Sequence, residues 1–146
     1  MKEVQLGVET YVGADIVDEL IASNNVKYGA NNRMFIVLNL LADEIPSADV
    51  ILCRDCLVHF SFRDIYRALH NFQASGSKYL VTTTFTRDQP NTDIRMGDFR
   101  PINLSQAPFS LPAPIRLINE GCTEQDGIYS DKCLSVWRLS DLPEMV

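Results

Sequence analysis

The stretch ADVILCRDCLVHF, residues 48–60, decides the fold of this chain. It stays apolar from Val50 to Leu52 and then turns abruptly into Arg54 and Asp55. A continuous apolar run is typical of a strand that is covered on both faces of a parallel sheet. Arginine and aspartate are rarely buried, so we expect the strand to end beside them, at the rim of a cleft. The alternative is a structural ion pair, or a cap for a helix that begins near Ser61.

Strands of the same kind are predicted on either side of this stretch. The runs RMFIVLNL (33–40) and KYLVTTTF (78–85) read as buried strands, and a shorter strand is expected at 10–15. The chain closes with PIRLINEG (114–121) and KCLSVWRL (132–139). Two such runs joined by a polar, glycine-containing segment predict an antiparallel edge hairpin.

Two helices are predicted between these strands. Apolar residues at helical spacing over 17–28 indicate the first, and Gly29 stands where that helix should end. Ser61 and Asp64 are spaced as a capping box, with aspartate in place of the usual glutamate, and Gly76 ends the second helix. Strands that alternate with helices predict an α/β fold with a mostly parallel sheet.

Residues 86–114 have no helical or strand pattern, and they hold five of the seven prolines. Connections of this length are usually functional or disordered. Because apolar and aromatic residues recur in it, we expect this segment to be a lid over the strand ends, within one domain of residues 1–146. Arg100 and Asn103 are candidate contacts for a polar substrate. The alternative is that four apolar side chains simply pin the segment to the core: Phe99, Leu104, Phe109 and Leu111.

The charge of the chain gives no sign of a polyanionic partner. Net charge is −6 with a pI near 4.8, and lysine and arginine form no cluster. This argues against nucleic acid or an anionic membrane surface as the main partner. No apolar run approaches the roughly 20 residues that span a bilayer, and the chain does not open with a signal-like segment. We therefore expect a cytoplasmic protein.

Four cysteines are present, and Cys53 and Cys56 form a C-x-x-C pair. A zinc site would need its other ligands from Cys122 and Cys133, whose spacing matches no zinc pattern. Cys53 also lies inside an apolar strand, where a free cysteine behaves as a small hydrophobe. The spacing favours structural cysteines over a metal or redox site, and we predict no metal.

Polar groups collect where each predicted parallel strand ends. Asp15, Asn39, the pair Arg54–Asp55 and the threonines at 82–84 all occupy such positions. In open parallel sheets, ligands bind outside the carboxyl ends of the strands. Four strand ends of the same character therefore favour a ligand cleft at this edge of the sheet.

The ordered set of these motifs resembles the class I S-adenosylmethionine-dependent methyltransferases. The matching pieces are GAD (13–15), VLNL (37–40), the stretch at 48–60 and the strand at 78–85. The segment FRPINLSQAPFSLPAP (99–114) looks like a bacterial subgroup of that family, with a proline-rich segment after its fifth strand. The resemblance implies a Rossmann-like fold and S-adenosylmethionine as cofactor.

The resemblance also implies cofactor contacts. Asp15, at the end of the family's second strand, would accept hydrogen bonds from the ribose hydroxyls, although a helix cap is the alternative for this residue. Asn39 would accept from the adenine amino group through its amide oxygen. Their neighbours Ile16 and Leu40 are expected beside the cofactor, and Arg54 near its methionine part.

Asp55 and His59 would lie near the transferring methyl group by the same resemblance. Either side chain would serve as a general base only if the acceptor must lose a proton. His70 falls on the edge of the apolar stripe of its helix, so a surface or partly packed position is expected.

The chain departs from the family at its start. The family's first strand carries a glycine-rich cofactor turn and lies between the strands expected here at 10–15 and 48–53, whereas the early glycines Gly7 and Gly13 form no G-x-G. The chain therefore resembles either a fragment of a longer methyltransferase or a reduced member of the family that has lost or rerouted cofactor binding. The segment KEVQL (2–6) is short and charged, which makes it a poor central strand. We expect the strands at 10–15 and 48–53 to pair directly, together with a homodimer and weak or absent cofactor binding.

Two hypotheses follow. The first is methyl transfer from S-adenosylmethionine to a small polar acceptor, by this chain or by a longer protein of which it is the C-terminal portion. The second is a non-catalytic α/β domain that dimerises or pairs with another chain. Fold alone does not decide between them.

Overall fold

A computed structural model describes residues 7–145. The chain divides into two compact units, one through Asp43 and one from Glu44 onward, and each is described by itself. The expectation of one domain over residues 1–146 stays a prediction. None of the helices in the described part of the chain is long and apolar enough to cross a membrane.

The first unit is a parallel strand–helix–strand motif. It consists of β1 (Tyr11–Asp15), α1 (Asp18–Tyr28) and β2 (Arg33–Val37), and Asp15 lies opposite Val37 in the ladder. The predicted strands and helix are confirmed, and α1 ends before Gly29 as expected. The strand at 33–40 is shorter than predicted because Asn39 folds the chain into a turn, in which its Oδ1 accepts from the Leu41 N–H at 3.0 Å.

A close backbone approach fixes the packing of this unit. A Cβ on Gly13 would lie 2.5 Å from the ring of Phe35, so only glycine leaves room for that ring. The Asn25 side chain donates to the Phe35 carbonyl at 2.7 Å and accepts from the Phe35 N–H at 2.9 Å. α1 is therefore tied to β2 by a side chain that completes the strand's hydrogen bonds.

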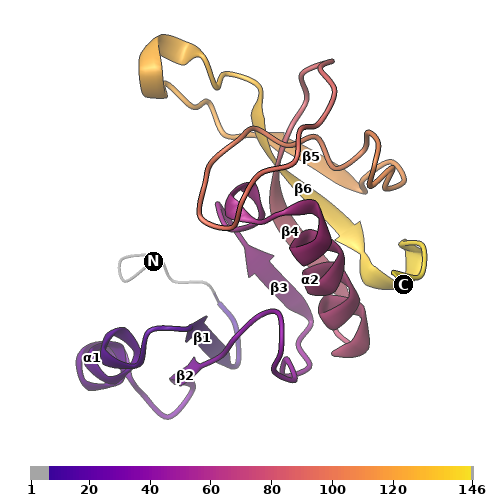
Figure 1. The fold of residues 1–146 in the computed structure, drawn as a ribbon. Coiled ribbons are helices and arrows are strands. Elements are labelled where there is room, and N and C mark those ends of the chain that lie inside the picture. Colours follow the sequence, from indigo (N-terminus) through magenta and orange to yellow (C-terminus); the bar gives the residue numbers. More distant parts are fainter. Residues whose placement is uncertain (1–6, 146) are drawn as a thin grey trace. The chain divides into compact units, whose positions relative to one another are not determined.

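The second unit holds a four-stranded sheet with order β3-β4-β6-β5. β3 (Val50–Cys53) and β4 (Tyr79–Phe85) are parallel, with α2 (Phe62–Ala74) between them in sequence. β5 (Arg116–Asn119) and β6 (Lys132–Arg138) form the predicted antiparallel hairpin, and β6 pairs with β4 while β5 takes the edge (Figure 1). The mixed α/β architecture predicted from the sequence is confirmed.

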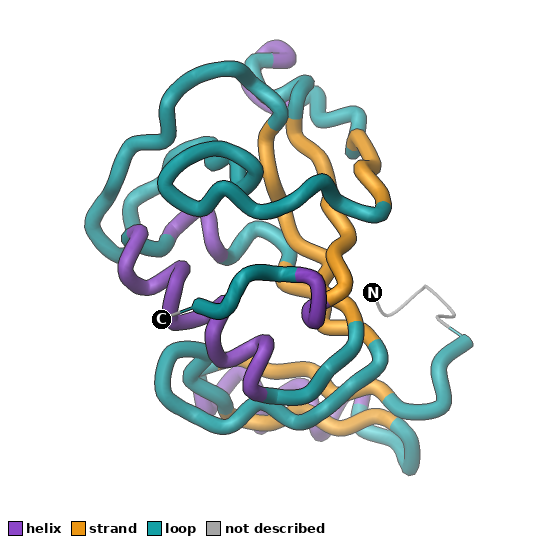
Figure 2. Tube along the Cα trace, turned by 90° about the vertical axis from the view of Figure 1, so that its right-hand side faces the viewer, coloured by secondary structure: helices purple, strands orange, loops and turns teal. Residues whose placement is uncertain are grey.

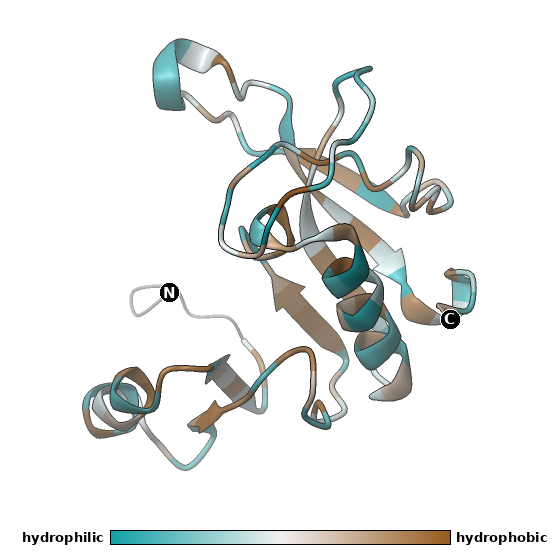
Figure 3. Cartoon of the chain, in the orientation of Figure 1, coloured by the Kyte–Doolittle hydropathy of each residue, from teal (hydrophilic) through white to brown (hydrophobic). Residues whose placement is uncertain are grey.

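α2 begins with the expected capping residues. The Ser61 hydroxyl oxygen accepts from the Asp64 N–H at 3.2 Å and donates to an Asp64 carboxylate oxygen at 2.6 Å. Aspartate thus binds the serine hydroxyl, where the longer glutamate of a capping box would reach back to the backbone. Ile65, Leu69 and Phe72 of α2 are fully buried, and Figure 3 shows β3 apolar along its whole length.

The segment 86–114 lies on the same face of this sheet as α2 (Figures 1 and 2). The Asn91 side chain donates to the carbonyls of Asn103 and Ala107, at 2.8 Å each. The indole N–H of Trp137, in β6, donates to the Pro112 carbonyl at 2.8 Å. The segment is therefore bound to itself and to the sheet, and its opening as a lid stays a prediction.

The opposite face of the same sheet is less covered. Val50 and Leu52 of β3 are 52% and 49% exposed, and Val81 and Val136 beside them are half-buried. Strands of parallel sheets normally have both faces covered. In residues 44–145, only one face of the sheet has a helix against it.

The predicted direct pairing of the strands at 10–15 and 48–53 stays a prediction, because β1 and β3 belong to different units. Within its own unit, each pairs with the next strand along the chain. A strand–helix–strand crossover pairs consecutive strands in this way, and it leaves one edge of β1 unpaired within residues 7–43 and one edge of β3 unpaired within residues 44–145. The segment 2–6, considered above as a central strand, lies outside the described residues.

The cap of α2 is open to a direct stability test. We expect Ser61→Ala to lower the free energy of unfolding by about 1 kcal/mol, the usual loss when a serine N-cap is removed. Urea unfolding of the variant and the parent measures the difference. Ser105→Ala, at an exposed serine of segment 86–114, is the control and should change stability by no more than about 0.5 kcal/mol. Equal stability of Ser61→Ala and the parent would contradict the assigned cap.

Candidate functional site

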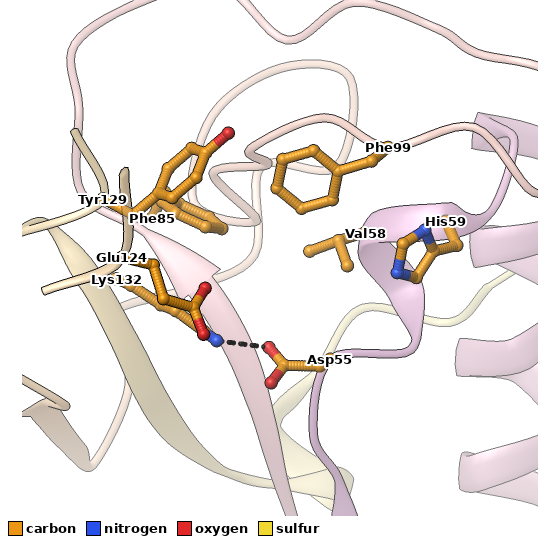
Figure 4. Close-up of a pocket in the computed structure, with 8 residues that line it drawn as sticks. All are labelled: Asp55, Val58, His59, Phe85, Phe99, Glu124, Tyr129 and Lys132. Atoms are coloured by element: carbon orange, nitrogen blue, oxygen red, sulfur yellow. Dashed lines mark ion pairs between the residues drawn. The ribbon is translucent and has the colours of Figure 1, made fainter. Parts of the chain in front are cut away.

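A cavity of about 180 Å³ lies where β3 and β4 end and β6 begins (Figure 4). All of its lining residues belong to the second unit: Asp55, Val58, His59, Phe85, Phe99, Glu124, Tyr129 and Lys132. It therefore occupies the edge of the sheet at which ligands were expected from the sequence.

The backbone brings these residues together in three steps. β3 ends at Cys53, and Asp55 takes a left-handed conformation with φ of 55°, which aspartate tolerates better than most residues. Its N–H donates to the Thr83 hydroxyl of β4 at 2.8 Å. A 3₁₀ helix, η1 (Leu57–His59), follows at once and carries His59. The antiparallel β6 starts at the same edge, with Lys132 opposite Phe85.

Asp55 and Lys132 form the polar floor of the cavity. The Lys132 ammonium is 2.7 Å from an Asp55 carboxylate oxygen, and the Thr83 hydroxyl donates to that oxygen at 3.2 Å. Burial raises the pKa of Asp55, but the hydrogen bond and charge of Lys132, with help from Arg54 and Thr83, outweigh it and lower the pKa below its ordinary value. Asp55 is therefore held as a carboxylate and is a weak proton acceptor at neutral pH.

Arg54 lies beside this floor. Its Nε donates to a Glu120 carboxylate oxygen at 2.7 Å, and its guanidinium is 3.4 Å from Asp55. The hydrogen bond to Glu120 raises the pKa of Arg54. The other Glu120 oxygen is buried, accepts no hydrogen bond from a described residue and lies 3.9 Å from the Lys132 ammonium. Arg54 and Asp55, the two residues that follow β3, thus belong to one ion-pair network, and Asp55 also faces the cavity.

His59 presents a defined tautomer. Its Nδ1 is 2.9 Å from the Asp98 carbonyl oxygen, which can only accept, so the ring carries its proton on Nδ1. The neutral ring then keeps a lone pair on Nε2. The other ring nitrogen, Nε2, lies on the side of the imidazole that faces Asp55 (Figure 4). Of the two candidate bases predicted, His59 is therefore the one that is set up to accept a proton.

Arg100 supports the turn that carries His59. Its buried guanidinium, 5% exposed as a residue, donates to the carbonyls of Leu57, Val58 and Phe60 at 2.9–3.2 Å. Its Nε also donates to a carbonyl of segment 86–114, at Thr92. The substrate contact suggested for Arg100 stays a prediction, whereas the structure shows a side chain that locks η1 to the segment.

Asn103 has a comparable structural role. Its amide nitrogen donates to the Arg87 carbonyl at 3.3 Å, and its amide oxygen accepts from the Ser105 N–H at 3.1 Å. These bonds organise segment 86–114, and Asn103 does not line the cavity. Its contact with a substrate also stays a prediction.

The cysteines play no visible part in the site. Cys53 is buried, and a hydrogen bond with Cys56 together with burial raises its pKa, which keeps it a thiol. All four cysteines are free, and no group of three or more His, Cys, Asp or Glu side chains in residues 7–145 is arranged to hold a metal ion. His70, on α2, is exposed and contacts the Met145 carbonyl through Nδ1 at 2.9 Å.

The residues predicted to hold the cofactor lie mostly in the first unit. Asp15 and Asn39 follow neighbouring parallel strands, and the Leu38 N–H donates to the Asp15 carbonyl at 2.9 Å between them. The Asp15 carboxylate accepts from the Val17 N–H at 3.0 Å, and Val17 rather than Asp15 is the N-cap of α1. Ile16 is 63% exposed. Leu40, half-buried, follows Asn39 in the same turn.

The sequence reasoning did not predict six of the lining residues or the Glu120 carboxylate beside them; the six are Val58, Phe85, Phe99, Glu124, Tyr129 and Lys132. Lys132 could have been found, because the first residue of an antiparallel strand lies at the edge where its parallel neighbour ends. Glu124 and Tyr129 belong to the irregular turn between β5 and β6, where no local pattern predicts which side chains face the sheet.

Comparisons with solved structures identify the fold. Human N-acetylserotonin methyltransferase in complex with S-adenosylmethionine aligns with a TM-score of 0.63 at 8% identity, over 90% of this chain and 41% of that one. A Burkholderia thailandensis 1,6-didemethyltoxoflavin N1-methyltransferase gives 0.62 at 16% identity, over 87% and 60%. The Synechocystis magnesium protoporphyrin IX methyltransferase with bound S-adenosylhomocysteine gives 0.59 at 12%, over 88% and 64%. The chain has the class I methyltransferase fold.

At sequence identities this low, the structural likeness shows the class I methyltransferase fold and nothing further. The chain covers less than two thirds of each of the three proteins. No protein-family model matches its sequence, and no curated protein matches it either. β1 and β2 pair as the second and third strands of the doubly wound order 3-2-1-4-5 do. β3 and β4 pair as its fourth and fifth strands do.

S-adenosylmethionine, the cofactor that this methyltransferase fold implies, fits the described residues in part. Asp15 and Asn39 offer a carboxylate and an amide oxygen at adjacent strand ends, which suits ribose hydroxyls and an adenine amino group. The glycine-rich cofactor turn is not found among residues 7–145. The space beside Gly13 is filled by the Phe35 ring, and the space beside Gly29 by the Asn25 carbonyl, so neither glycine leaves room for a cofactor. The fit is to the adenosine half of the cofactor.

The Asp55 carboxylate should make stability depend on acid. Because its folded pKa is lowered, Asp55 stabilises the fold above its unfolded pKa of about 3.9, and this stability is lost as pH falls through the folded pKa. We expect Asp55→Asn to cost about 1 kcal/mol or less at pH 7, since the carboxylate is partly exposed. The difference from the parent should shrink below about pH 4.

Urea unfolding at several pH values measures this difference. Asp126→Asn is the matched control, because Asp126 has the same φ of 55° but makes no ion pair with a described residue. A cost of Asp55→Asn that stays constant from neutral to strongly acidic pH would show that the carboxylate charge is not responsible.

Proposed function

We propose that this chain carries the acceptor pocket and the adenosine contacts of an S-adenosylmethionine-dependent methyltransferase that acts on a small polar acceptor. The observation that supports this most is His59, whose Nε2 lone pair faces a cavity at the strand ends of a methyltransferase fold. The free cysteines support a cytoplasmic location as part of the proposal, since reduced thiols are typical of that compartment.

The chemistry asks mainly for alignment. S-adenosylmethionine, when bound, supplies a methyl group on a positively charged sulfur. Displacement at such a carbon depends on how the acceptor is positioned more than on acid–base help. The Asp55–Lys132 pair gives the acceptor a fixed polar floor, and Arg100 fixes η1 so that His59 keeps its orientation. His59 Nε2 takes the proton if the acceptor must lose one.

The adenosine contacts are assigned to the first unit. Asp15 would accept from the ribose hydroxyls and Asn39 from the adenine amino group, with Ile16 and Leu40 packed beside them. Arg54 belongs to the second unit, where its guanidinium binds Glu120, and its contact with the methionine end stays a prediction.

Titration calorimetry with S-adenosylhomocysteine tests the proposal. We expect binding, and we expect Asp15→Ala to weaken it by about 1–3 kcal/mol, the usual loss when one partner of a charged hydrogen bond is removed. Glu9→Ala is the control, because Glu9 is exposed and precedes β1, at the opposite end from Asp15. No heat at millimolar ligand would refute cofactor binding, and equal affinities of Asp15→Ala and the parent would remove Asp15 from the site.

A non-catalytic role has its own supporting observation. The outer edge of β3 has no strand partner within residues 44–145, and its Val50 and Leu52 side chains are half exposed. Exposed strand edges pair readily with another chain. We propose as the second candidate a methyltransferase-like domain that dimerises through this region.

Light scattering at micromolar concentration measures the mass in solution and shows whether the chain dimerises. The second candidate predicts a species near twice 16.5 kDa. Leu52→Lys should return it to a monomer, because a charge on an edge strand disfavours pairing. Leu117→Lys on β5, which is also exposed, is the control that should leave the dimer intact. A monomeric parent would exclude this candidate.

A further inference from the structure

Aromatic rings make up much of the cavity wall. Phe85 and Tyr129 meet edge to face with their centroids 5.8 Å apart, and Phe99 meets Tyr129 in the same way at 5.6 Å. The His59 imidazole lies 5.7 Å from the Phe99 ring. Figure 4 shows Phe99 beside Phe85 and Tyr129, with Val58 between this cluster and His59.

The aromatic wall is held from outside the cavity. The Arg87 guanidinium lies 5.2 Å from the Phe85 ring centroid and 5.8 Å from that of Tyr129. Arg87 is in turn fixed by Asp131, with its Nε and one terminal nitrogen 2.9 and 2.6 Å from the two carboxylate oxygens. Two of the lining rings are therefore held in place by a fixed guanidinium.

The size of the cavity limits what it can hold. A cavity of about 150 Å³ lined by apolar side chains binds benzene. The space here is about 180 Å³. It therefore suits one six-membered ring with a small substituent, and a ligand with more rings would have to extend beyond it.

The charges on the lining select against an anion. Lys132 is paired with Asp55 at 2.7 Å, whereas Glu124 makes no ion pair with a described residue. The lining groups thus sum to one negative charge, and the Glu120 carboxylate behind Lys132 is balanced by its ion pair with Arg54. An anionic ligand would meet net repulsion, whereas a neutral or cationic one would not.

We infer that the acceptor is a planar aromatic ring, neutral or cationic, that carries a hydroxyl or amino group directed at His59. This inference rests on the proposed function and names its substrate class. The ring packs against the cluster formed by Phe85, Phe99 and Tyr129 while its substituent meets the polar floor. When a hydroxyl acceptor ionises, the O–H bonding electrons stay on oxygen, and the proton forms a new N–H bond on His59 Nε2.

Ligand titrations followed by NMR test the inference on the whole chain without cofactor. Phenol is the probe, cyclohexanol its saturated counterpart of similar size, and benzoate its anionic counterpart. We expect phenol to bind in the millimolar range and to shift the His59 side-chain resonances. Cyclohexanol should bind about tenfold more weakly, since each aromatic contact adds about 0.5–1.5 kcal/mol beyond burial. Benzoate should also bind more weakly than phenol.

Tyr129→Leu isolates the aromatic contribution. Tyr129 is only half-buried, so its replacement by another apolar side chain should leave the fold intact. The variant should lose most of the preference for phenol over cyclohexanol. Tyr79→Leu is the matched control, because Tyr79 is also half-buried but begins β4, whereas the cavity lies at the Phe85 end. This control should keep the preference.

The outcomes separate the inference from the proposed function. Equal affinities for phenol and cyclohexanol, or tighter binding of benzoate, would overturn the inferred acceptor class even if S-adenosylhomocysteine binds. Absence of phenol binding at tens of millimolar would overturn it as well. Selective phenol binding by a chain that ignores S-adenosylhomocysteine would support an aromatic site and refute the methyltransferase.

Discussion

The contact between Asp55 and Lys132 is the constraint on which the site depends. It joins the first residues beyond β3 to the first residue of β6, and the two lie on opposite sides of β4 in the sheet. The left-handed backbone at Asp55 and its hydrogen bond to Thr83 hold the carboxylate in place for this contact. The pair gives the cavity its floor, and it keeps Asp55 ionised. Under the proposed function, proton acceptance is thereby left to His59.

His59 itself depends on groups far away in the sequence. The Asp98 carbonyl selects its tautomer, and Arg100 fixes the turn on which it stands. Both come from segment 86–114, whose lack of any periodic pattern made it hard to interpret. A buried guanidinium needs several acceptors, and the carbonyls of a short 3₁₀ helix, which have few partners of their own, provide them. The same interaction satisfies a buried charge and positions a base.

Local patterns predicted what they physically determine. The apolar run before Arg54, the Ser61–Asp64 spacing and the final hairpin gave correct elements because strand burial, capping and hairpin formation depend on neighbouring residues. The cleft was expected at the strand ends because polar residues follow each apolar run. Lys132 and Tyr129 were missed because their place follows from strand register and from an irregular turn. Within each unit, the crossover connection sets the strand pairing, so β1 pairs with β2 and β3 with β4.

The walls of the cavity are not held equally. On the side of His59 and Phe99, Arg100 and its carbonyl partners would all have to separate before the wall could move. On the other side Glu124 belongs to the short turn η2 (Glu124–Gly127), in which Gln125 and Asp126 adopt left-handed conformations that cost energy for residues other than glycine. Entry and release of a ligand should therefore begin at η2, on the side of Glu124, rather than at η1.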